Sequence, residues 1–517
     1  MDQSQHKPDQ RSPEDEEFRM ASPLRAPVRA DVVVVGGGPV GMLIAAELGA
    51  YGVSAVVLER RAATSERPKA TTLHARTTQT LARRGYLPAP SPTAGPVASA
   101  FHFAGIPGLR ITAPAGEPEP VLKRAQVELE RHFEDRARAH GAEVLREHRV
   151  TGIDQLPDGV RVFAEGPEGA VEVEAAYAVG ADGAHSTVRE QAGFACDTYA
   201  PTLSAMMGLV RLDEPGALRA GWHRTPRGWV VTKDAPDGRT HIRTVNFSRT
   251  HADRERPLTL AELRDEASQI MGRELGMSDP RWLSRFSDYA RVARDYRQGR
   301  VLLAGDAAHL HFPIGGQGLS TGLLDALNLG WKLAATVRGT ASDGLLDSYD
   351  AERRPAAERV VVNVRAQVSL MHPEARLDEL RGLFGALLPE ERGGAYLGAM
   401  ISAQDTVLPP RSADASAVEG TFLPNLALTT PDGPTDVIRL LRDGRMLLLL
   451  LGPDTADGSV EQYEKAAQDR AHAVRIVRAE PVDEAPGTAL LVRPDGYIAW
   501  AGDGGPLEEA LTAYLGA

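Results

Sequence analysis

The stretch DVVVVGGGPVGMLIAAELGA, residues 31 to 50, decides the fold. Its β-branched run at 31–35 precedes a glycine-rich turn and an Ala/Leu-rich stretch through Ala50, which predicts strand, turn and helix. A second apolar run, from Ser54 to Leu58, ends on Glu59 and completes a unit of the ~30 residues that a βαβ motif needs. The sequence therefore predicts an α/β protein built on a Rossmann-type dinucleotide-binding unit.

The glycines of this turn have separate roles. Gly36 allows the tight bend, Gly38 lets backbone N–H groups approach a pyrophosphate, and Gly41 lets the helix lie close to the strand. The helix N-terminus adds partial positive charge where the phosphates would lie. Glu59 is placed to accept hydrogen bonds from ribose hydroxyls and would repel a 2′-phosphate. NAD and FAD are therefore favoured over NADP at this site.

Composition narrows the function classes. A chain of 517 residues predicts two or three domains, and its net charge of −12 disfavours nucleic acid as a partner. Cys196 is the only cysteine, so we expect a reducing, cytoplasmic setting without disulfides or a cysteine-rich zinc site. The most apolar run, from Met446 to Leu451, is far shorter than the ~20 residues that span a bilayer, so no membrane partner is expected.

Hydrophobic patterns outline the rest of the chain. We expect helices from Ala70 to Arg84 and from Gln126 to His140, separated by a connection that includes residues 88–98. Alternation over 206–247 predicts a largely antiparallel sheet inserted into the first domain. Further predicted elements are strands at 160–163, 171–179, 300–304, 446–451 and 490–493, and helices at 319–337 and 507–515.

Three motifs in a fixed order suggest a family. GADGAHSTVR at 180–189 and GDAAH at 305–309 follow the N-terminal glycine turn, and PIGGQGL at 313–319 leads to DALNLGWKL at 325–333. Together they resemble the fingerprints of the group A FAD-dependent aromatic hydroxylases, the para-hydroxybenzoate hydroxylase-like family. The segment PKATTLHART at 68–77 is most similar to the members that hydroxylate polycyclic aromatic polyketides in antibiotic biosynthesis.

This resemblance implies a set of FAD contacts. Glu59 and Arg60 would hold the adenosine end, Arg76 and Gln126 the phosphate and ribityl regions, and Asp182 both FAD and the incoming nicotinamide nucleotide. The helix that begins near Leu319 would stabilise negative charge on the reduced flavin. The complete predicted set is Gly36, Gly38, Pro39, Val40, Gly41, Glu59, Arg60, Lys69, Arg76, Gln126, Asp182, Asp306, Pro313, Gly316, Gly318 and Leu319.

The implied reaction is a monooxygenation. NADPH, or NADH, would reduce FAD as a transient co-substrate, O₂ would add at flavin C4a as a (hydro)peroxide, and one oxygen atom would pass to the substrate, most simply by hydroxylation. Three alternatives stay open: Baeyer–Villiger insertion on the same scaffold, an FAD-dependent reductase or dehydrogenase, and, more distantly, a non-catalytic nucleotide-binding regulator. No residue is predicted to be catalytic in its own right.

The resemblance also implies a domain plan. The fold would be a Rossmann-type FAD-binding domain with an inserted, mainly antiparallel substrate domain and a C-terminal thioredoxin-like α/β domain without a redox motif; a homodimer is a further possibility. The expected boundaries are a disordered tail at 1–28, FAD-binding parts at 29–200 and 296–400, the substrate sheet at 201–295 and the C-terminal domain at 401–517.

Several residues have plainer interpretations. Trp222 is the predicted substrate contact, with sheet packing as an equal alternative, whereas Trp229 is expected to pack. His309 and His311 lack further ligands, so no metal is expected. Ser186 is expected to cap a helix. Three positions depart from the family pattern, namely Gln79, Ser320 and Leu324; Gln79 is expected to be structural.

Overall fold

The computed structural model describes residues 27–516, except 68, 215, 249, 251–255, 413 and 452–458. Residues 1–26 of the expected tail lie outside this part, and Val28 already begins the first strand. No helix in the described ranges is long and apolar enough to cross a membrane.

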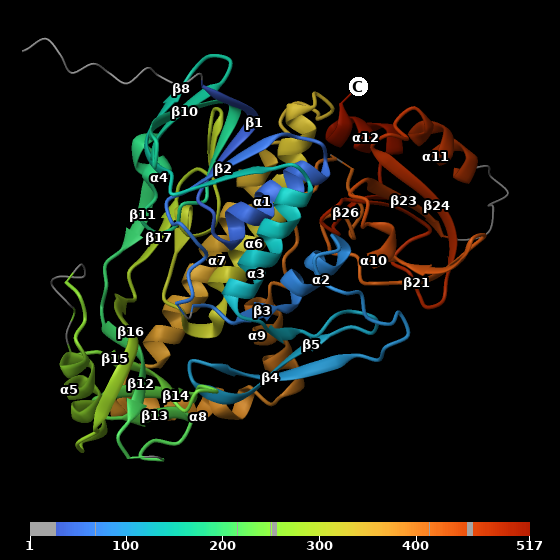
Figure 1. The fold of residues 1–517 in the computed structure, drawn as a ribbon. Helices are drawn as coiled ribbons and strands as arrows, with labels where there is room; N and C mark the ends of the chain where they lie inside the picture. Colours follow the sequence, from blue (N-terminus) through green and yellow to red (C-terminus); the bar gives the residue numbers. More distant parts are fainter. Residues whose placement is uncertain are drawn as a thin grey trace, which may run out of the picture.

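An eight-stranded sheet forms the centre of the molecule (Figure 1). Strands β1, β2, β7, β10 and β19 run parallel, in the order β19-β10-β1-β2-β7, and β18, β8 and β9 add antiparallel edges. The four valines that end β1 are buried, as expected for a strand covered on both faces. The strands are β1 Val28–Val35, β2 Ala55–Glu59, β7 Glu143–Arg146, β8 Arg149–Gln155, β9 Val160–Gly166, β10 Gly169–Gly180, β18 Arg297–Gln298 and β19 Val301–Leu303.

Long helices pack beside this sheet and beside one another. Helix α1 contacts both α3 and α6, and α7 packs on α6. Small residues permit the closest contacts: a Cβ at Gly330 would lie 2.5 Å from the Cβ of Glu47 on α1. The helices are α1 Pro39–Ala50, α2 Ala75–Arg83, α3 Gln126–Ala139, α4 Thr187–Gln191, α6 Gly318–Val337 and α7 Ser348–Leu370.

The predicted antiparallel sheet is confirmed. Its strands lie in the order β13-β14-β15-β12-β16, and helix α5, Leu260–Met271, packs on it through an apolar cluster (Figure 1). A three-stranded sheet, β11-β17-β20, lies between this layer and the central sheet. The strands are β11 Cys196–Tyr199, β12 Ser204–Leu212, β13 Gly221–Thr225, β14 Gly228–Asp234, β15 Thr240–Asn246, β16 Met277–Ser287, β17 Ala290–Ala293 and β20 His309–Leu310.

The C-terminal part contains a six-stranded mixed sheet in the order β22-β21-β24-β23-β25-β26. The predicted strands at 446–451 and 490–493 are its centre, and the predicted last helix is α12. The elements are β21 Ala427–Thr430, β22 Gly433–Asp436, α10 Val437–Leu440, β23 Met446–Leu451, α11 Ser459–Gln468, β24 Val474–Pro481, β25 Ala489–Val492, β26 Ile498–Ala501 and α12 Leu507–Leu515.

Two stretches differ from the sequence-based prediction. The expected helix from Ala70 begins only at Ala75, because Thr72–His74 forms strand β3, which pairs with β6, Val121–Lys123. The last two residues of the expected 88–98 connection already belong to a hairpin that the prediction lacked, with strands β4, Val97–Phe103, and β5, Ile106–Ala113. Helices α8, Asp378–Leu387, and α9, Glu391–Ser402, pack against β5.

Candidate active site

The three sequence motifs meet at one edge of the central sheet. Val35 at the end of β1 pairs with Gly180 at the end of β10, and Gly180 pairs with Leu303 at the end of β19. The glycine turn at 36–41 follows Val35 directly, the motif at 180–189 begins at Gly180 itself, and the motif at 305–309 begins two residues after Leu303. Since the carboxyl ends of parallel strands are where α/β sheets bind ligands, the structure brings the motifs to the expected place.

The N-terminal glycine turn is packed on one side and open on the other. Gly36 has φ +105°, and a Cβ there would lie 2.4 Å from the carbonyl oxygen of Ala181. A Cβ at Gly41 would lie 2.0 Å from the carbonyl oxygen of Gly36. At Gly38, in contrast, an added Cβ would meet no atom of the described residues within 4 Å. The turn thus leaves an open cradle in front of α1, whose first turn begins with Pro39 and has no side-chain cap in the described structure.

Glu59 holds this turn in place. Its Oε2 accepts a hydrogen bond from Gly37 N at 2.7 Å, and its Oε1 accepts one from Arg61 N at 2.9 Å. Each carboxylate oxygen keeps a second lone pair for a ligand hydroxyl. Arg60 follows it on the exposed surface.

The second motif presents a buried carboxylate. Oδ2 of Asp182 accepts from Val188 N at 3.1 Å, while Oδ1 has no hydrogen-bond partner among the described residues. Burial raises the pKa of Asp182, although hydrogen bonds from Ser186 and Val188 oppose the shift. Ser186 caps α4 by accepting from Arg189 N at 3.0 Å, which confirms its predicted role.

Two buried arginines join the second and third motifs. Arg291 donates to the carbonyl oxygen of Ala184 at 2.8 Å, and Arg189 donates to the carbonyl oxygen of Ala307 at 3.2 Å. Both loops are therefore fixed relative to each other by the protein itself.

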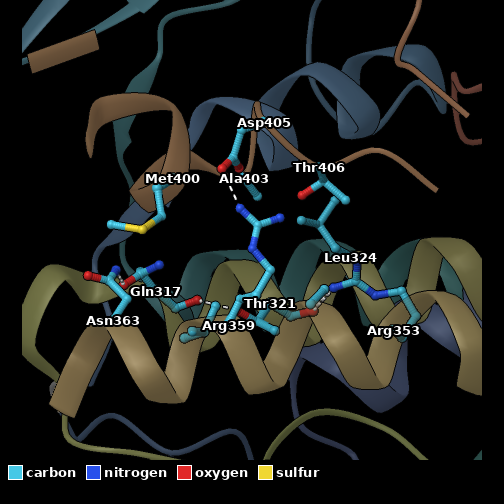
Figure 2. Close-up of a pocket in the computed structure, with 12 residues that line it drawn as sticks. Gln317, Thr321, Leu324, Arg353, Arg359, Asn363, Met400, Ala403, Asp405 and Thr406 are labelled. Carbon is cyan, nitrogen blue, oxygen red and sulfur yellow. Dashed lines mark hydrogen bonds and ion pairs between the residues drawn. The ribbon is translucent and has the colours of Figure 1, made fainter. Parts of the chain in front are cut away.

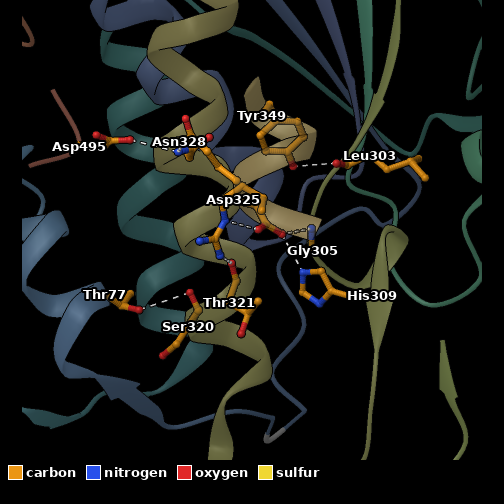
Figure 3. A network of polar contacts seen from close by, with 12 residues as sticks. Thr77, Leu303, Gly305, His309, Ser320, Thr321, Asp325, Asn328, Tyr349 and Asp495 are labelled. Atoms are coloured by element: carbon orange, nitrogen blue, oxygen red, sulfur yellow. Dashed lines mark hydrogen bonds and ion pairs between the residues drawn. The ribbon is translucent and has the colours of Figure 1, made fainter. Parts of the chain in front are cut away.

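The third motif is anchored to α6 and α7 by a buried carboxylate (Figure 3). Asp325 accepts hydrogen bonds from Gly305 N at 3.1 Å, from His309 Nε2 at 2.7 Å and from Arg353 Nε at 2.9 Å. Burial alone would raise the pKa of Asp325, but His309 and Arg353 together hold it below its ordinary value. This network gives His309 a structural partner and leaves Asp306 exposed beside it.

Lys69 belongs to the same neighbourhood. Desolvation lowers the pKa of its ammonium, as does the charge of Arg61, while Glu130, Asp306 and Glu59 act in the opposite direction. The carboxylates of Asp306 and Glu59, two other predicted contacts from separate segments, therefore lie close enough to Lys69 to act on its charge. Of these three groups, only the ammonium of Lys69 would attract an anionic cofactor.

The loop before α6 is held by strand β3. Gly315 and Gly316 have φ +74° and +64°, and a Cβ at Gly316 would lie 3.4 Å from the Cβ of Thr72. Nε2 of His74 lies 2.8 Å from the carbonyl oxygen of Gly315, and His74 N donates to Ser320 Oγ at 3.0 Å. Ser320, one of the departures from the family pattern, thus ties the helix to β3.

The first turn of α6 faces this loop. Pro313 opens the loop, and Gly318 and Leu319 begin a helix without a side-chain cap in the described part. Their N–H groups therefore provide partial positive charge for a ligand. His311 lies against Gly318, and burial lowers the pKa of its ring.

Arg76 contacts the C-terminal part of the chain. Its guanidinium donates to Gln79 Oε1 at 2.8 Å and to the carbonyl oxygen of Gln404 at 2.9 Å, and it stacks over the ring of Phe422 at 3.6 Å. The structure therefore gives Arg76 contacts with the C-terminal part of the chain and a hydrogen bond to Gln79, whose structural role stays a prediction. Gln126 begins α3, and its N–H donates to the carbonyl oxygen of Ala70.

Aromatic side chains gather where the β4–β5 hairpin meets the antiparallel sheet. Trp222 on β13 is 37% exposed and lies edge-on to His102 and Trp229. Trp229 is buried and donates its Nε1–H to the carbonyl oxygen of Met371 at 2.7 Å, as its predicted packing role requires. Phe101 on β4 stacks on His102 and meets His74 edge-on.

Sequence reasoning missed the residues that β3, β4 and β6 contribute. Lys123 donates to Thr72 Oγ1 at 2.8 Å and lies over the ring of Phe101. Burial lowers the pKa of His102 to about 4, and the charge of Lys123 acts in the same direction. Phe101, His102 and Lys123 lie outside the motifs noted in the sequence, whereas Thr72 lies within the segment at 68–77.

The described residues contain no group of three or more His, Cys, Asp or Glu that could hold a metal ion. Within these ranges the site is built instead from glycine turns, helix N-termini and single carboxylates.

Comparisons with known proteins agree with this geometry. A family model described as "FAD binding domain" matches residues 29–364, and one described as "Aromatic-ring hydroxylase, C-terminal" matches residues 416–517. The 12-dehydrotetracycline 5-monooxygenase/anhydrotetracycline 6-monooxygenase of Streptomyces rimosus is 40% identical over 493 residues, which cover 92% of this chain and 95% of the relative.

Two further relatives span nearly the whole chain. The dialkyldecalin synthase of Streptomyces rugosporus is 39% identical over 490 residues, which cover 94% of this chain and 98% of that protein. The solved structure of the OxyS anhydrotetracycline hydroxylase from Streptomyces rimosus superposes with a TM-score of 0.84 at 38% identity, and covers 95% of this chain and 100% of that one.

Proposed function

The chain belongs to the FAD-dependent aromatic-ring hydroxylases, and from this premise we propose that it oxygenates a polycyclic aromatic polyketide in an antibiotic pathway. The observation that carries the proposal is the meeting of three motifs at the carboxyl ends of β1, β10 and β19. This edge of the sheet offers one continuous site for a dinucleotide.

The residues present fit FAD. Gly38 leaves open space in front of α1, Asp182 has a buried oxygen with no partner among the described residues, and the first turn of α6 has no side-chain cap in them. We assign the pyrophosphate to the turn at 36–41, the adenosine ribose to Glu59, and the pyrimidine edge of the flavin to the N–H groups of Gly318 and Leu319. These assignments follow from charge and hydrogen-bonding capacity.

When bound and reduced by NAD(P)H, FAD supplies the activation of O₂ and the oxygen atom that is transferred. The chain's own residues bind and orient. Arg189 and Arg291 fix the loops around Asp182 and Asp306, and Asp325 fixes the turn at 305–309 from behind. The N-terminus of α6 stabilises negative charge near Gly318.

The aromatic side chains where the β4–β5 hairpin meets the antiparallel sheet, Phe101, His102 and Trp222, are our candidate for the surface that contacts the substrate, here called the substrate face. Trp222 keeps an exposed ring beside His102, and a flat polycycle has the shape and apolar surface that such rings recognise. The relative from Streptomyces rimosus acts, by its name, on tetracycline intermediates, which are polycycles of this kind. A homodimer and the domain boundaries given above remain predictions.

Three other outcomes are distinguishable on the same scaffold. Baeyer–Villiger insertion would place the oxygen in an ester or lactone, and a reductase would consume NAD(P)H without oxygenating the substrate. The third outcome is ring formation by a synthase. One relative that aligns over nearly its whole length with this chain is named a dialkyldecalin synthase.

The test is to incubate the purified protein with NADPH, ¹⁸O₂ and a panel of polycyclic aromatic compounds that includes anhydrotetracycline, and to determine product mass and fragmentation. We expect one ¹⁸O atom in a new phenol or alcohol. One ¹⁸O in an ester or lactone would establish Baeyer–Villiger chemistry instead. Consumption of NADPH without incorporation, or ring formation without consumption, would contradict the monooxygenase.

A further inference from the structure

Three buried side-chain amides connect the loop before α6 to the tip of the β4–β5 hairpin. They belong to Gln317, Asn363 and Gln367, whose exposed fractions are 2%, 3% and 0%. We refer to these three residues as the amide ladder. Figure 2 shows Gln317 and Asn363 facing each other at one end of a small cavity between α6, α7 and residues 400–406.

The hydrogen bonds of the amide ladder form an unbroken series. Ala104 N–H donates to Gln367 Oε1 at 3.0 Å, Gln367 Nε2 donates to Asn363 Oδ1 at 3.4 Å, and Asn363 Nδ2 donates to Gln317 Oε1 at 2.8 Å. Asn363 and Gln367 stand four residues apart on one face of α7, so their side chains lie one above the other. Every donor points the same way, and aligned amides polarise one another.

At the hairpin end the ladder supports a strained turn. Ala104 and Gly105 both have positive φ, 53° and 74°, as a two-residue hairpin turn requires. Alanine adopts this conformation at a cost, and here its N–H is satisfied by Gln367. A Cβ at Gly105 would lie 3.0 Å from the ring of Trp222 and 3.2 Å from that of Trp229, so the turn borders the proposed substrate face.

At the other end the ladder touches the flavin loop, residues 313–319. A Cβ at Gly315 would lie 3.1 Å from Gln367 Nε2 and 3.4 Å from Gln317 Oε1. Gln317 is also the N-cap residue of α6, and its carbonyl oxygen accepts from Thr321 N. The loop therefore lies directly against the ladder.

We propose that the amide ladder is a positioning device that couples the flavin loop to the hairpin, so that FAD, by ordering the loop, also orders the substrate face. This inference rests on the proposed function. A buried amide that loses its partner is unfavourable, and the ladder therefore favours loop and hairpin being ordered together.

The test is hydrogen–deuterium exchange on the apoprotein and on the protein reconstituted with FAD. In the wild type we expect FAD to slow exchange both in the flavin loop and in the hairpin at 103–106, in the latter by about tenfold or more. Asn363→Leu and Gln367→Met keep the side-chain size but remove the amide. In each, FAD should still protect the loop, while the added protection of the hairpin falls to less than about twofold.

Controls separate coupling from folding. Val362→Ala, on the exposed face of α7, should behave as the wild type, and peptides from β23 and β25 report folding in the same samples. The double variant should lose no more hairpin protection than either single variant, because one broken link interrupts the series.

Two results would overturn the coupling alone: a wild-type hairpin that FAD leaves unchanged although the loop is protected, or full hairpin protection in both variants. A flavin loop that FAD does not protect in the wild type would instead refute the assigned flavin site, and the coupling with it.

Discussion

Gly38 lies at the N-cap of α1, beside the open space in front of this helix. Its φ of −78° is ordinary, and an added Cβ meets no described atom within 4 Å. Gly38→Ala should therefore lower the stability of the apoprotein by less than about 1 kcal/mol, the cost of a poorer helix cap. The substitution should weaken the binding of FAD at least about tenfold, roughly 1.4 kcal/mol, because the methyl group enters the space assigned to the pyrophosphate.

Titration of the apoprotein with FAD and a thermal melt measure both quantities. Gly382→Ala on α8 is the matched control, since a Cβ there also meets no described atom within 4 Å. Equal FAD affinity in Gly38→Ala and the wild type would refute the assignment of the pyrophosphate to this turn.

His74 makes stability depend on pH. Burial lowers the pKa of its ring to about 4, although the hydrogen bond to Gly315 opposes the shift. As the pH falls, the ring is protonated near pH 6.5 in the unfolded chain but only near pH 4 in the folded chain. The free energy of unfolding therefore decreases as the pH falls from about 6.5 to about 4, by on the order of 3 kcal/mol. His102, whose pKa burial also lowers to about 4, adds a loss of the same sign.

Urea unfolding at pH 7, 6 and 5 measures this loss. His74→Gln should flatten the dependence, whereas His472→Gln, at an exposed position, should leave it unchanged. An unchanged slope in His74→Gln would contradict a buried, neutral His74.

Among the elements, β13 and β14 carry two tryptophans with different roles. Trp229→Ala should cost about 3–5 kcal/mol of stability, because it leaves a cavity and an unpaired carbonyl at Met371. Trp222→Ala should cost much less, because its ring is partly exposed, but it should weaken the binding of a polycyclic probe such as anhydrotetracycline. Chemical denaturation and fluorescence quenching separate the two effects; unchanged probe affinity in Trp222→Ala would remove this residue from the substrate face.

Elements with long, regular patterns were predictable from sequence, and short ones were not. The valine run of β1 and the apolar stretch of α6 carry their own signal. Strand β3 has three residues and exists because it pairs with β6, about fifty residues later in the chain. Such pairing overrides local preference, and for that reason an early helix start at Ala70 was wrong.

On the scale of the whole molecule, buried arginines attach the C-terminal part to the FAD-binding part. Arg493 makes two hydrogen bonds of 2.8 Å to Glu352 on α7, and Arg84 pairs with Glu47 while donating to the carbonyl oxygen of Leu441. Arg83 pairs with Glu117 and donates to the carbonyl oxygen of Leu423. We therefore expect one cooperative unfolding transition for both parts.

Arg493→Met tests this attachment. It would leave the buried carboxylates of Glu352 and Asp495 without their guanidinium, at a cost of roughly 3–5 kcal/mol. Arg478→Met, which removes a half-exposed ion pair with Glu464, should cost about 0–1 kcal/mol. Calorimetry of both variants measures the two losses of stability. Equal melting temperatures would show that the buried ion pairs do not stabilise the attachment of the C-terminal part to the FAD-binding part.

Contacts between distant parts of the chain limit how much of the site can be predicted from the sequence. The motifs at 36–41, 180–189 and 305–309 are local and could be found in the sequence. The network around Asp325 and the amide ladder join residues far apart in the chain, and only the folded structure brings them together. Arg76 illustrates the converse, because its motif was visible but two of its contacts, the carbonyl oxygen of Gln404 and the ring of Phe422, belong to the C-terminal part.

The flavin content of the purified protein tests the central claim most directly. After reconstitution and removal of free cofactor, denaturation should release one FAD per chain, and the native protein should absorb near 450 nm as flavoproteins do. A folded protein that retains no FAD after reconstitution would contradict the account of the site and of the function built on it.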